Sequence, residues 1–340
     1  DGAPGPPGPT VINLQGLTDE QIGELDVESR ITSVVLATEG GRPQVTFRLE
    51  TAGGTPILGL VPYWQASNRF VRFALAKLVP GTPDDWVSYT RNGSGDPSYD
   101  TGRSLTSLGN GAYTFTFETN VSAVPGVTYQ PGLTHRVAGQ LGSGSVPLEA
   151  QNMFRDVVPT GAAMTTTRNI AVMESCNECH SDLVFHGRRF EVEYCVTCHN
   201  PDLASGEGDF AFMIHRIHAA GDFTILDGGI SYSELTYPQD LRNCRKCHED
   251  GTLGADDADL WRTNPNVAAC FGCHVLADHP GGAPPANPEI CIECHDADAV
   301  EEHHLLPNAT PHNPMLFPNQ VNIAYELVSA SVDMGTNDVT

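Results

Sequence analysis

One short pattern, Cys-x-x-Cys-His, occurs five times in the second half of this 340-residue chain. The copies start at Cys176, Cys195, Cys244, Cys270 and Cys291, and together they use all ten cysteines. This spacing is the attachment site of c-type haem, because two thiols three positions apart can both reach the vinyl groups of one porphyrin. The histidine that follows lies under the iron and can bind it from one side.

The pattern assigns a role to each of its residues. The predicted thioether cysteines are Cys176, Cys179, Cys195, Cys198, Cys244, Cys247, Cys270, Cys273, Cys291 and Cys294. The predicted proximal iron ligands are His180, His199, His248, His274 and His295. The predicted cofactor is therefore five haem c groups, with no catalytic residue.

Three other uses of cysteine fit the pattern less well. A four-cysteine zinc site takes two Cys-x-x-Cys pairs, so five pairs leave one over, and zinc needs no histidine after each second cysteine. A thioredoxin-like redox pair would occur once, beside a βαβ pattern. A disulfide framework does not explain five identical spacings. Haem is therefore the preferred interpretation.

Each haem iron has a second axial position, and the same half of the chain has seven further histidines. The predicted distal ligands are His186, His215, His218, His279, His303 and His304, with His303 slightly preferred over its neighbour. His312 and His135 are expected to be structural. Two imidazoles on each iron give a low-spin haem suited to electron transfer, whereas an enzyme that binds substrate at iron must keep one position open.

Several charged residues near the motifs could contact the haems or bind an ion. The arginines expected to pair with haem propionates, or simply to aid solubility, are Arg188, Arg189, Arg242 and Arg245. An acidic run at Asp256, Asp257 and Asp259 gives weak support for calcium, because it lacks the glycine and the final glutamate of an EF-hand loop.

Composition narrows the range of partners. The net charge is -24, with 42 acidic and 18 basic residues, so neither nucleic acid nor an anionic membrane is an expected partner. Such a surface favours cationic or metal-ion partners. No run of about 18 apolar residues is present, so no membrane-spanning segment is expected. The chain starts at Asp1 without a signal peptide and is interpreted as a processed form.

The first half of the chain has the pattern of a β protein. Alternating apolar residues predict strands at 30–36, 44–49, 70–75, 112–118 and 134–141, separated by turn-rich clusters. Residues 92–110 are expected to form a long polar loop. The predicted fold class is multidomain: an N-terminal all-β sandwich or Greek-key barrel, then a loop-rich, mostly non-regular pentahaem domain with short helices. One clear helix is predicted at 209–220.

These patterns divide the chain into four parts. Residues 1–25 are expected to be a Gly/Pro-rich tether, 26–165 the β-sandwich, and 166–312 the pentahaem domain. Residues 313–340 form an extension with one candidate strand at 322–333, which resembles the opening of the β domain. That strand could add to a second subunit or begin a second repeat.

Several segments resemble the OmcA/MtrC family of bacterial outer-membrane multihaem cytochromes. They are Leu75–Gly81, Leu133–Val137, Glu174–His180, Tyr194–Pro201, Met213–His218 and Tyr237–Cys244. The resemblance covers about residues 28–305. It implies a β-barrel-like domain and a pentahaem domain at the extracellular surface of a Gram-negative bacterium, and a lipid-anchored precursor. Typical members carry ten haems in two such halves, whereas this chain has five motifs.

The expected function is extracellular electron transfer to metal oxides, metal ions, flavins or other cytochromes. One version is a cytochrome filament of identical subunits, joined by the C-terminal strand. The alternatives are a discrete cell-surface terminal metal reductase, or a multihaem reductase with an open haem. Pentahaem nitrite reductases mark their active haem with lysine in place of the motif histidine, and all five motifs here end in histidine.

Overall fold

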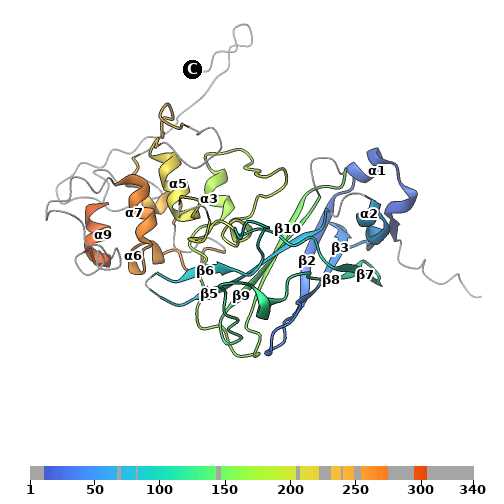
Figure 1. Ribbon diagram of the computed structural model, residues 1–340. Coiled ribbons are helices and arrows are strands. Elements are labelled where there is room, and N and C mark those ends of the chain that lie inside the picture. Colours follow the sequence, from blue (N-terminus) through green and yellow to red (C-terminus); the bar gives the residue numbers. More distant parts are fainter. Residues whose placement is uncertain are drawn as a thin grey trace, which may run out of the picture.

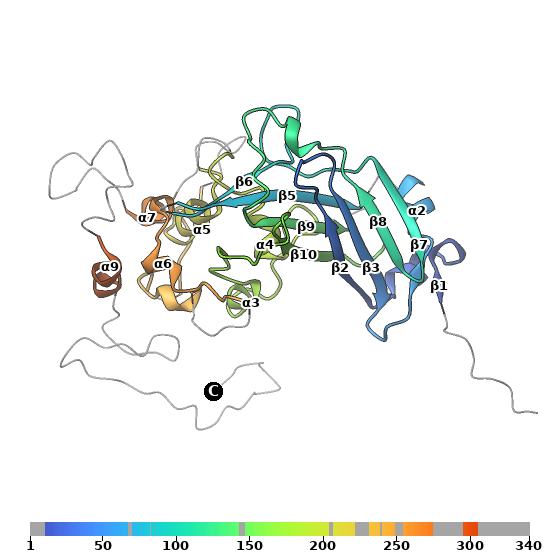
Figure 2. The same ribbon diagram turned by 90° about the horizontal axis from the view of Figure 1, so that it is seen from below.

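The computed structural model describes residues 11–66, 70–81, 83–142, 147–203, 207–221, 231–238, 240–248, 254–274 and 295–304 (Figure 1). The predicted C-terminal strand and residues 1–10 lie outside these ranges. The described chain forms a β-sandwich, residues 11–157, and a lobe of short helices at one end of it, residues 168–304, called here the motif half (Figures 1 and 2).

Two four-stranded antiparallel sheets build the sandwich. The first has the order β2 (Val27–Val35), β3 (Gln44–Thr51), β8 (Ala112–Thr116), β7 (Ser104–Gly109). The second has the order β10 (Gln151–Val157), β9 (His135–Leu141), β5 (Arg72–Val79), β6 (Asp85–Ser88). In the described residues the two sheets stay separate, so the structure is a sandwich and not a closed barrel.

Aromatic side chains fill the space between the sheets. Phe73 of the second sheet lies with its ring centroid 4.7 Å from Phe115 and 5.8 Å from Phe47, both in the first sheet. All three are fully buried. Side chains along a strand point alternately to its two faces, and each of these rings lies on the face that points to the other sheet. The alternating pattern in the sequence therefore found the sandwich core.

Residues 11–25 are part of the sandwich, so the predicted tether over residues 1–25 is wrong for them. Strand β1 (Ile12–Asn13) pairs in parallel with β4 (Ile57–Leu58). A 3-10 helix (Leu14–Gly16) and α1 (Asp19–Gly23) follow, and Thr18 and Gln21 form a capping box at the start of α1. Leu14 and Ile22 are buried in the core, which fixes this segment to the sheets.

Shorter elements complete the sandwich. They are α2 (Leu60–Ala66) and a 3-10 helix at Val121–Ala123. Strand β7 lies inside the predicted polar loop 92–110, which corrects that prediction. The sequence pattern did not reveal β7 because only Leu105 of its six residues is buried. Its turn to β8 contains Asn110 and Gly111 at positive φ, so the glycine-rich cluster is the tight turn of a hairpin.

The motif half contains little regular structure, as predicted. Its helices are α3 (Met173–Asn177), α4 (Val192–Cys195), α5 (Phe210–His218), a 3-10 helix at Cys244–Lys246, α6 (Leu260–Thr263), α7 (Val267–Cys273) and α9 (Ala297–His303). Helix α5 matches the predicted helix, with Asp209 capping its first amides. Within the described residues, no helix combines the length and apolar character needed to cross a bilayer.

The central strands β5 and β9 of the second sheet are covered on both faces. All seven residues of β9 are buried, although a strand with one face in solvent would alternate. One face points into the sandwich, and the other lies against the motif half. Ala74 and Ala138 of this outer face contact Tyr194 and Cys198. The sandwich is therefore directly joined to the second motif.

Candidate functional site

The four motifs whose cysteines are described share one local shape. In each, the motif histidine donates its backbone amide to the carbonyl of the first cysteine, at 3.0 Å for His180, 2.8 Å for His199, 3.0 Å for His248 and 2.8 Å for His274. This is one turn of helix, so the two cysteines stand on one side of it. The turn presents both thiols together, as attachment to one porphyrin edge requires.

Each of these four histidines faces a second histidine from outside the motifs. The ring centroids are 6.2 Å apart for His180 and His218, 5.8 Å for His199 and His186, 6.1 Å for His248 and His215, and 6.1 Å for His274 and His304. Every pair joins one motif histidine to one spare histidine. The fold therefore repeats a single arrangement four times.

The separation fits one metal ion between two imidazoles. A histidine nitrogen binds a metal at about 2 Å, and each ring nitrogen lies about 1 Å from its centroid, so two rings on opposite sides of one ion have centroids about 6 Å apart. The donor set therefore fits a haem iron with two axial histidines, attached through the neighbouring cysteines.

Hydrogen bonds orient several of these rings. The Nδ1 atom donates to a backbone carbonyl in His199 (Gly208, 3.0 Å), His215 (Ala211, 2.6 Å), His218 (Ile214, 2.8 Å), His248 (Ile170, 3.3 Å) and His304 (Val300, 2.6 Å). A protonated Nδ1 leaves the lone pair on Nε2, the other ring nitrogen. Such partners fix the tautomer and the direction of a ligating histidine.

Burial also keeps the rings neutral. Burial lowers the pKa of His215. Burial also lowers the pKa of His248 to about 4, and the neighbouring His215 is a smaller cause in the same direction. A metal ligand must be a neutral imidazole, and these shifts favour that form at His215 and His248.

The remaining predicted residues divide into two groups. Cys291, Cys294, His279 and His312 lie outside the described residues, so the second ligand of His295 stays a prediction. Among the described ones, His304 faces His274, whereas His303 is exposed at the end of α9. This geometry favours His304, contrary to the slight preference from sequence.

His135 belongs to the sandwich and not to a haem site. It is fully buried, donates from Nδ1 to the Leu133 carbonyl at 2.8 Å, and accepts at Nε2 from the Tyr89 hydroxyl at 3.2 Å. The Tyr89 ring stacks on the imidazole at 5.6 Å. Both nitrogens are occupied, in line with the structural role expected for it.

Most of the predicted propionate partners are held by protein groups. Arg242 pairs with Asp240 at 2.6 Å, and Arg245 pairs with Glu301 at 2.8 Å. Arg189 donates to Gln140.

The acidic run predicted as a weak calcium candidate includes Asp257, whose carboxylate accepts from Thr167 and from the Asn169 amide. In the described ranges no group of three or more His, Cys, Asp or Glu side chains is arranged to hold one metal ion.

Sequence reasoning missed the sandwich residues that hold the motif half. Arg136 on β9 is 1% exposed and binds Asp156 at 2.7 Å and Asn169 at 2.6 Å. The Cys198 thiol contacts the Ser98 carbonyl at 3.4 Å. A charged residue in the middle of a predicted strand indicates a buried partner, and Arg136 could have been found in this way. Loop contacts such as that of Ser98 have no sequence signature.

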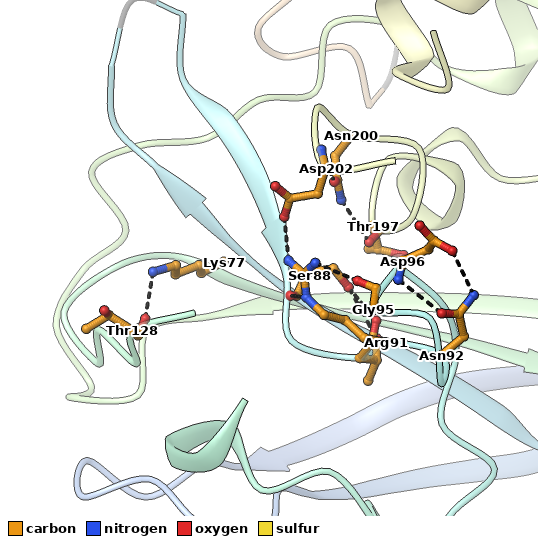
Figure 3. Close-up of polar contacts among 11 residues, drawn as sticks. Lys77, Ser88, Arg91, Asn92, Gly95, Asp96, Thr128, Thr197, Asn200 and Asp202 are labelled. Carbon is orange, nitrogen blue, oxygen red and sulfur yellow. Dashed lines mark hydrogen bonds and ion pairs between the residues drawn. The ribbon is translucent and has the colours of Figure 1, made fainter. Parts of the chain in front are cut away.

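Figure 3 shows a further tie near the second motif. The Arg91 guanidinium contacts Asp202 at 2.5 Å and the carbonyls of Ser88 and Gly95 at 3.1 and 2.8 Å. Asp202 follows the second motif by three residues. The loop after the motif is therefore fixed to the sandwich as well as the motif itself.

The four described motifs lie next to one another. His218 and His215, both on α5, face the motif histidines of the first and third motifs. Lys246 of the third motif forms an ion pair with Glu178 of the first. Helix α7, which carries the fourth motif, packs so closely on α5 that a Cβ at Gly272 would stand 2.5 Å from the His215 Cβ. The resulting order is motif 1, motif 3, motif 4.

Comparisons with known proteins agree with this geometry. Residues 168–312 match the family model for outer membrane cytochrome MtrC/MtrF-like, domains II/IV. The chain is 30% identical over 285 residues to the multiheme cytochrome MtrC of Shewanella baltica (strain OS185), which is 78% of this chain and 39% of that protein.

Two solved structures are similar as well. The crystal structure of MtrC from Shewanella baltica OS185 has a TM-score of 0.63 at 26% identity, and covers 82% of this chain and 44% of that one. The crystal structure of the outer membrane decaheme cytochrome OmcA has a TM-score of 0.64 at 24% identity, with 82% and 46% covered. The chain spans less than half the length of each of these relatives.

The repeated haem-binding turns and histidine pairs define a multihaem cytochrome of the c type. The chain belongs to the OmcA/MtrC family.

Proposed function

We propose that this chain carries electrons to extracellular acceptors through five haem c groups, each bound by two histidines. The observation that carries the proposal is the set of four histidine pairs at 5.8–6.2 Å, each made from one motif histidine and one spare histidine. Two strong axial ligands leave no open iron position, which suits electron transfer and not substrate binding.

The assignments follow the pairs. His180 and His218 bind the first haem, His199 and His186 the second, His248 and His215 the third, and His274 and His304 the fourth. His295 binds the fifth, and we propose His279 as its second ligand. Haem supplies the reversible Fe(III)/Fe(II) couple, and the protein supplies the ligands, the spacing and the surrounding charges.

The neighbouring motifs make a path. Helix α5 provides distal ligands three residues apart to the first and third haems, so these two irons must lie close together. The fourth site lies against the same helix through α7. The second motif starts 19 residues after the first, so we place its haem next to the first haem. The proposed path of the electrons therefore runs through the second, first, third and fourth haems, in either direction.

The MtrC and OmcA relatives are described as multiheme or decaheme cytochromes of the outer membrane, which supports a surface location for this chain. Metal oxides, metal ions, flavins and other cytochromes are the proposed acceptors, reached by outer-sphere transfer. Filament formation through residues 322–333 stays a prediction, since this strand lies outside the described residues. A reductase with an open haem is disfavoured at the four described pairs.

The test is rapid mixing of the fully reduced protein with a soluble ferric chelate, with carbon monoxide binding as a second readout. We expect reoxidation of all haems and no carbon monoxide adduct. His215→Met should raise the reduction potential of the third haem, because a methionine ligand favours the ferrous form, and should change the rate of transfer between the first and third haems. His303→Met is the matched control and should change neither. A carbon monoxide adduct in the native protein would contradict the proposal.

A further inference from the structure

Arg189 stands at the junction of three parts of the molecule. Its backbone closes the loop that presents His186: the Phe185 amide donates to the Arg189 carbonyl at 2.8 Å, and the Arg189 amide donates to the Phe185 carbonyl at 2.9 Å. Between them His186 and Gly187 both adopt positive φ, at 47° and 84°. His186 is thus held in a strained conformation that these two bonds impose.

The side chain of Arg189 turns away from this loop towards the sandwich. Its Nε donates to Gln140 Oε1 on β9 at 3.0 Å. The amide nitrogen of Gln140 donates to the Gly142 carbonyl at 2.8 Å, which fixes the amide so that its oxygen faces Arg189. Gln140 is 1% exposed, so the acceptor is shielded from water.

Two aromatic rings complete the guanidinium's surroundings. It lies 5.3 Å from the ring centroid of Tyr99 and 4.9 Å from that of Tyr194. Tyr99 belongs to the sandwich, and Tyr194 directly precedes the second motif. Rings at this distance attract a cation with their faces. Arg72 lies at 4.5 Å from the Tyr99 ring, so that ring also bears a second cation.

The charge of Arg189 lies close to the second haem site. Arg189 is three positions after His186, and its guanidinium lies 4.9 Å from the ring of Tyr194, the residue directly before Cys195. In the described part of the chain no carboxylate is bonded to this guanidinium.

We propose that Arg189 is a positioning residue of the second haem site, which sets the direction of His186 through its backbone and raises the reduction potential of that haem through its fixed positive charge. The inference rests on the proposed ligation. A ferric haem with two histidines has one more positive charge than the ferrous form. A nearby cation therefore favours the ferrous form, and more so where water is excluded.

The experiment is a potentiometric titration of the haem-loaded full chain, monitored by electron paramagnetic resonance. Arg189→Gln should lower the potential of one low-spin component by about 59 mV, which is a tenfold change in the ratio of reduced to oxidised haem for a one-electron couple. Arg189→Lys keeps the charge and should restore most of this potential.

Arg188→Gln is the matched control. It removes the same charge one residue away. Arg188 contacts β10 through its backbone carbonyl, which accepts from the Asn152 side-chain amide at 2.9 Å. We expect a clearly smaller shift. An equal shift in both variants, or none in Arg189→Gln, would overturn the role of Arg189.

A second variant covers the case in which Arg189→Gln fails to take up haem. Gln140→Met combined with Tyr99→Leu leaves the cation and the loop bonds intact but releases the guanidinium, and should lower the same potential part of the way. An unchanged potential there would refute the proposal. A high-spin signal in the unaltered protein would instead refute the ligation scheme, so the two failures are distinguishable.

Discussion

Replacing His135 by glutamine should remove an acid-dependent loss of stability from the sandwich. Burial lowers the pKa of His135 from 6.5 to about 4, with its bond to Leu133 opposing this and Lys77 reinforcing it as smaller causes. Between these two values the unfolded chain binds a proton at this position and the folded chain does not. The folded state therefore loses stability as the pH falls from about 6.5 to about 4.

The magnitude follows from the width of that window. At about 1.4 kcal/mol for each pH unit, a window of about 2.5 units gives a loss of about 3 kcal/mol. Above pH 6.5 the ring is neutral in both states, and His135 adds no pH dependence. The substitution also removes the bond to Tyr89, but that cost is the same at every pH.

The assay is guanidinium unfolding of the haem-loaded chain, followed by far-ultraviolet circular dichroism at pH 7 and at pH 4. Covalent haem stays attached in both states, and effects of the haem ligands cancel between the two proteins. We expect the free-energy difference between wild type and His135→Gln to shrink by about 3 kcal/mol from pH 7 to pH 4. A difference independent of pH would show that His135 is not held neutral by burial.

Three further predictions address the histidine pairs and the junction of the two halves. His304→Met should change the ligand field of one haem, read from its absorption and magnetic circular dichroism, whereas His303→Met should not; the reverse result would restore the preference from sequence. The rings are tilted by 28° and 15° in the second and third pairs but by 63° and 84° in the first and fourth, so two classes of low-spin resonance signal are expected, and a single class would contradict this geometry. Arg136→Met should destabilise the junction by about 3 kcal/mol in denaturant unfolding, because it leaves the Asp156 carboxylate, only 10% exposed, without its partner. Exposed Arg155→Met is the control, at about 1 kcal/mol, and equal losses would contradict the role of the Arg136–Asp156 pair.

The sequence predicted the central strands well because their inward faces carry regular apolar residues. Strands β3, β5, β8 and β9 lie where alternation placed them. It could not predict that β9 is buried on both faces, since that depends on the motif half packing on it. The small residues Ala74 and Ala138, which give Tyr194 room, look unremarkable in sequence.

The short elements were missed for a different reason. Strand β6 has four residues and β1 has two, too few to establish a period. The Gly/Pro-rich opening suggested a tether that continued to residue 25. Burial of Leu14 and Ile22 decides otherwise from residue 11 onwards, and single apolar residues between polar ones give little warning of this.

The motif spacing identified the chemistry, but the partners of the motif histidines needed the fold. His215 and His218 are only three residues apart, yet they face motif histidines that are 68 positions apart in the chain, His248 and His180. No local pattern encodes such pairings. The choice between His303 and His304 likewise depends on which of the two rings faces His274.

The most direct test of the account is a low-temperature electron paramagnetic resonance spectrum of the oxidised, haem-loaded chain, with the spins counted against the haem content measured by mass spectrometry. Five haems with only low-spin ferric signals are predicted, because every iron would have two histidine ligands. A high-spin ferric signal that accounts for one haem or more would contradict full histidine ligation, and with it the proposal that this chain only conducts electrons.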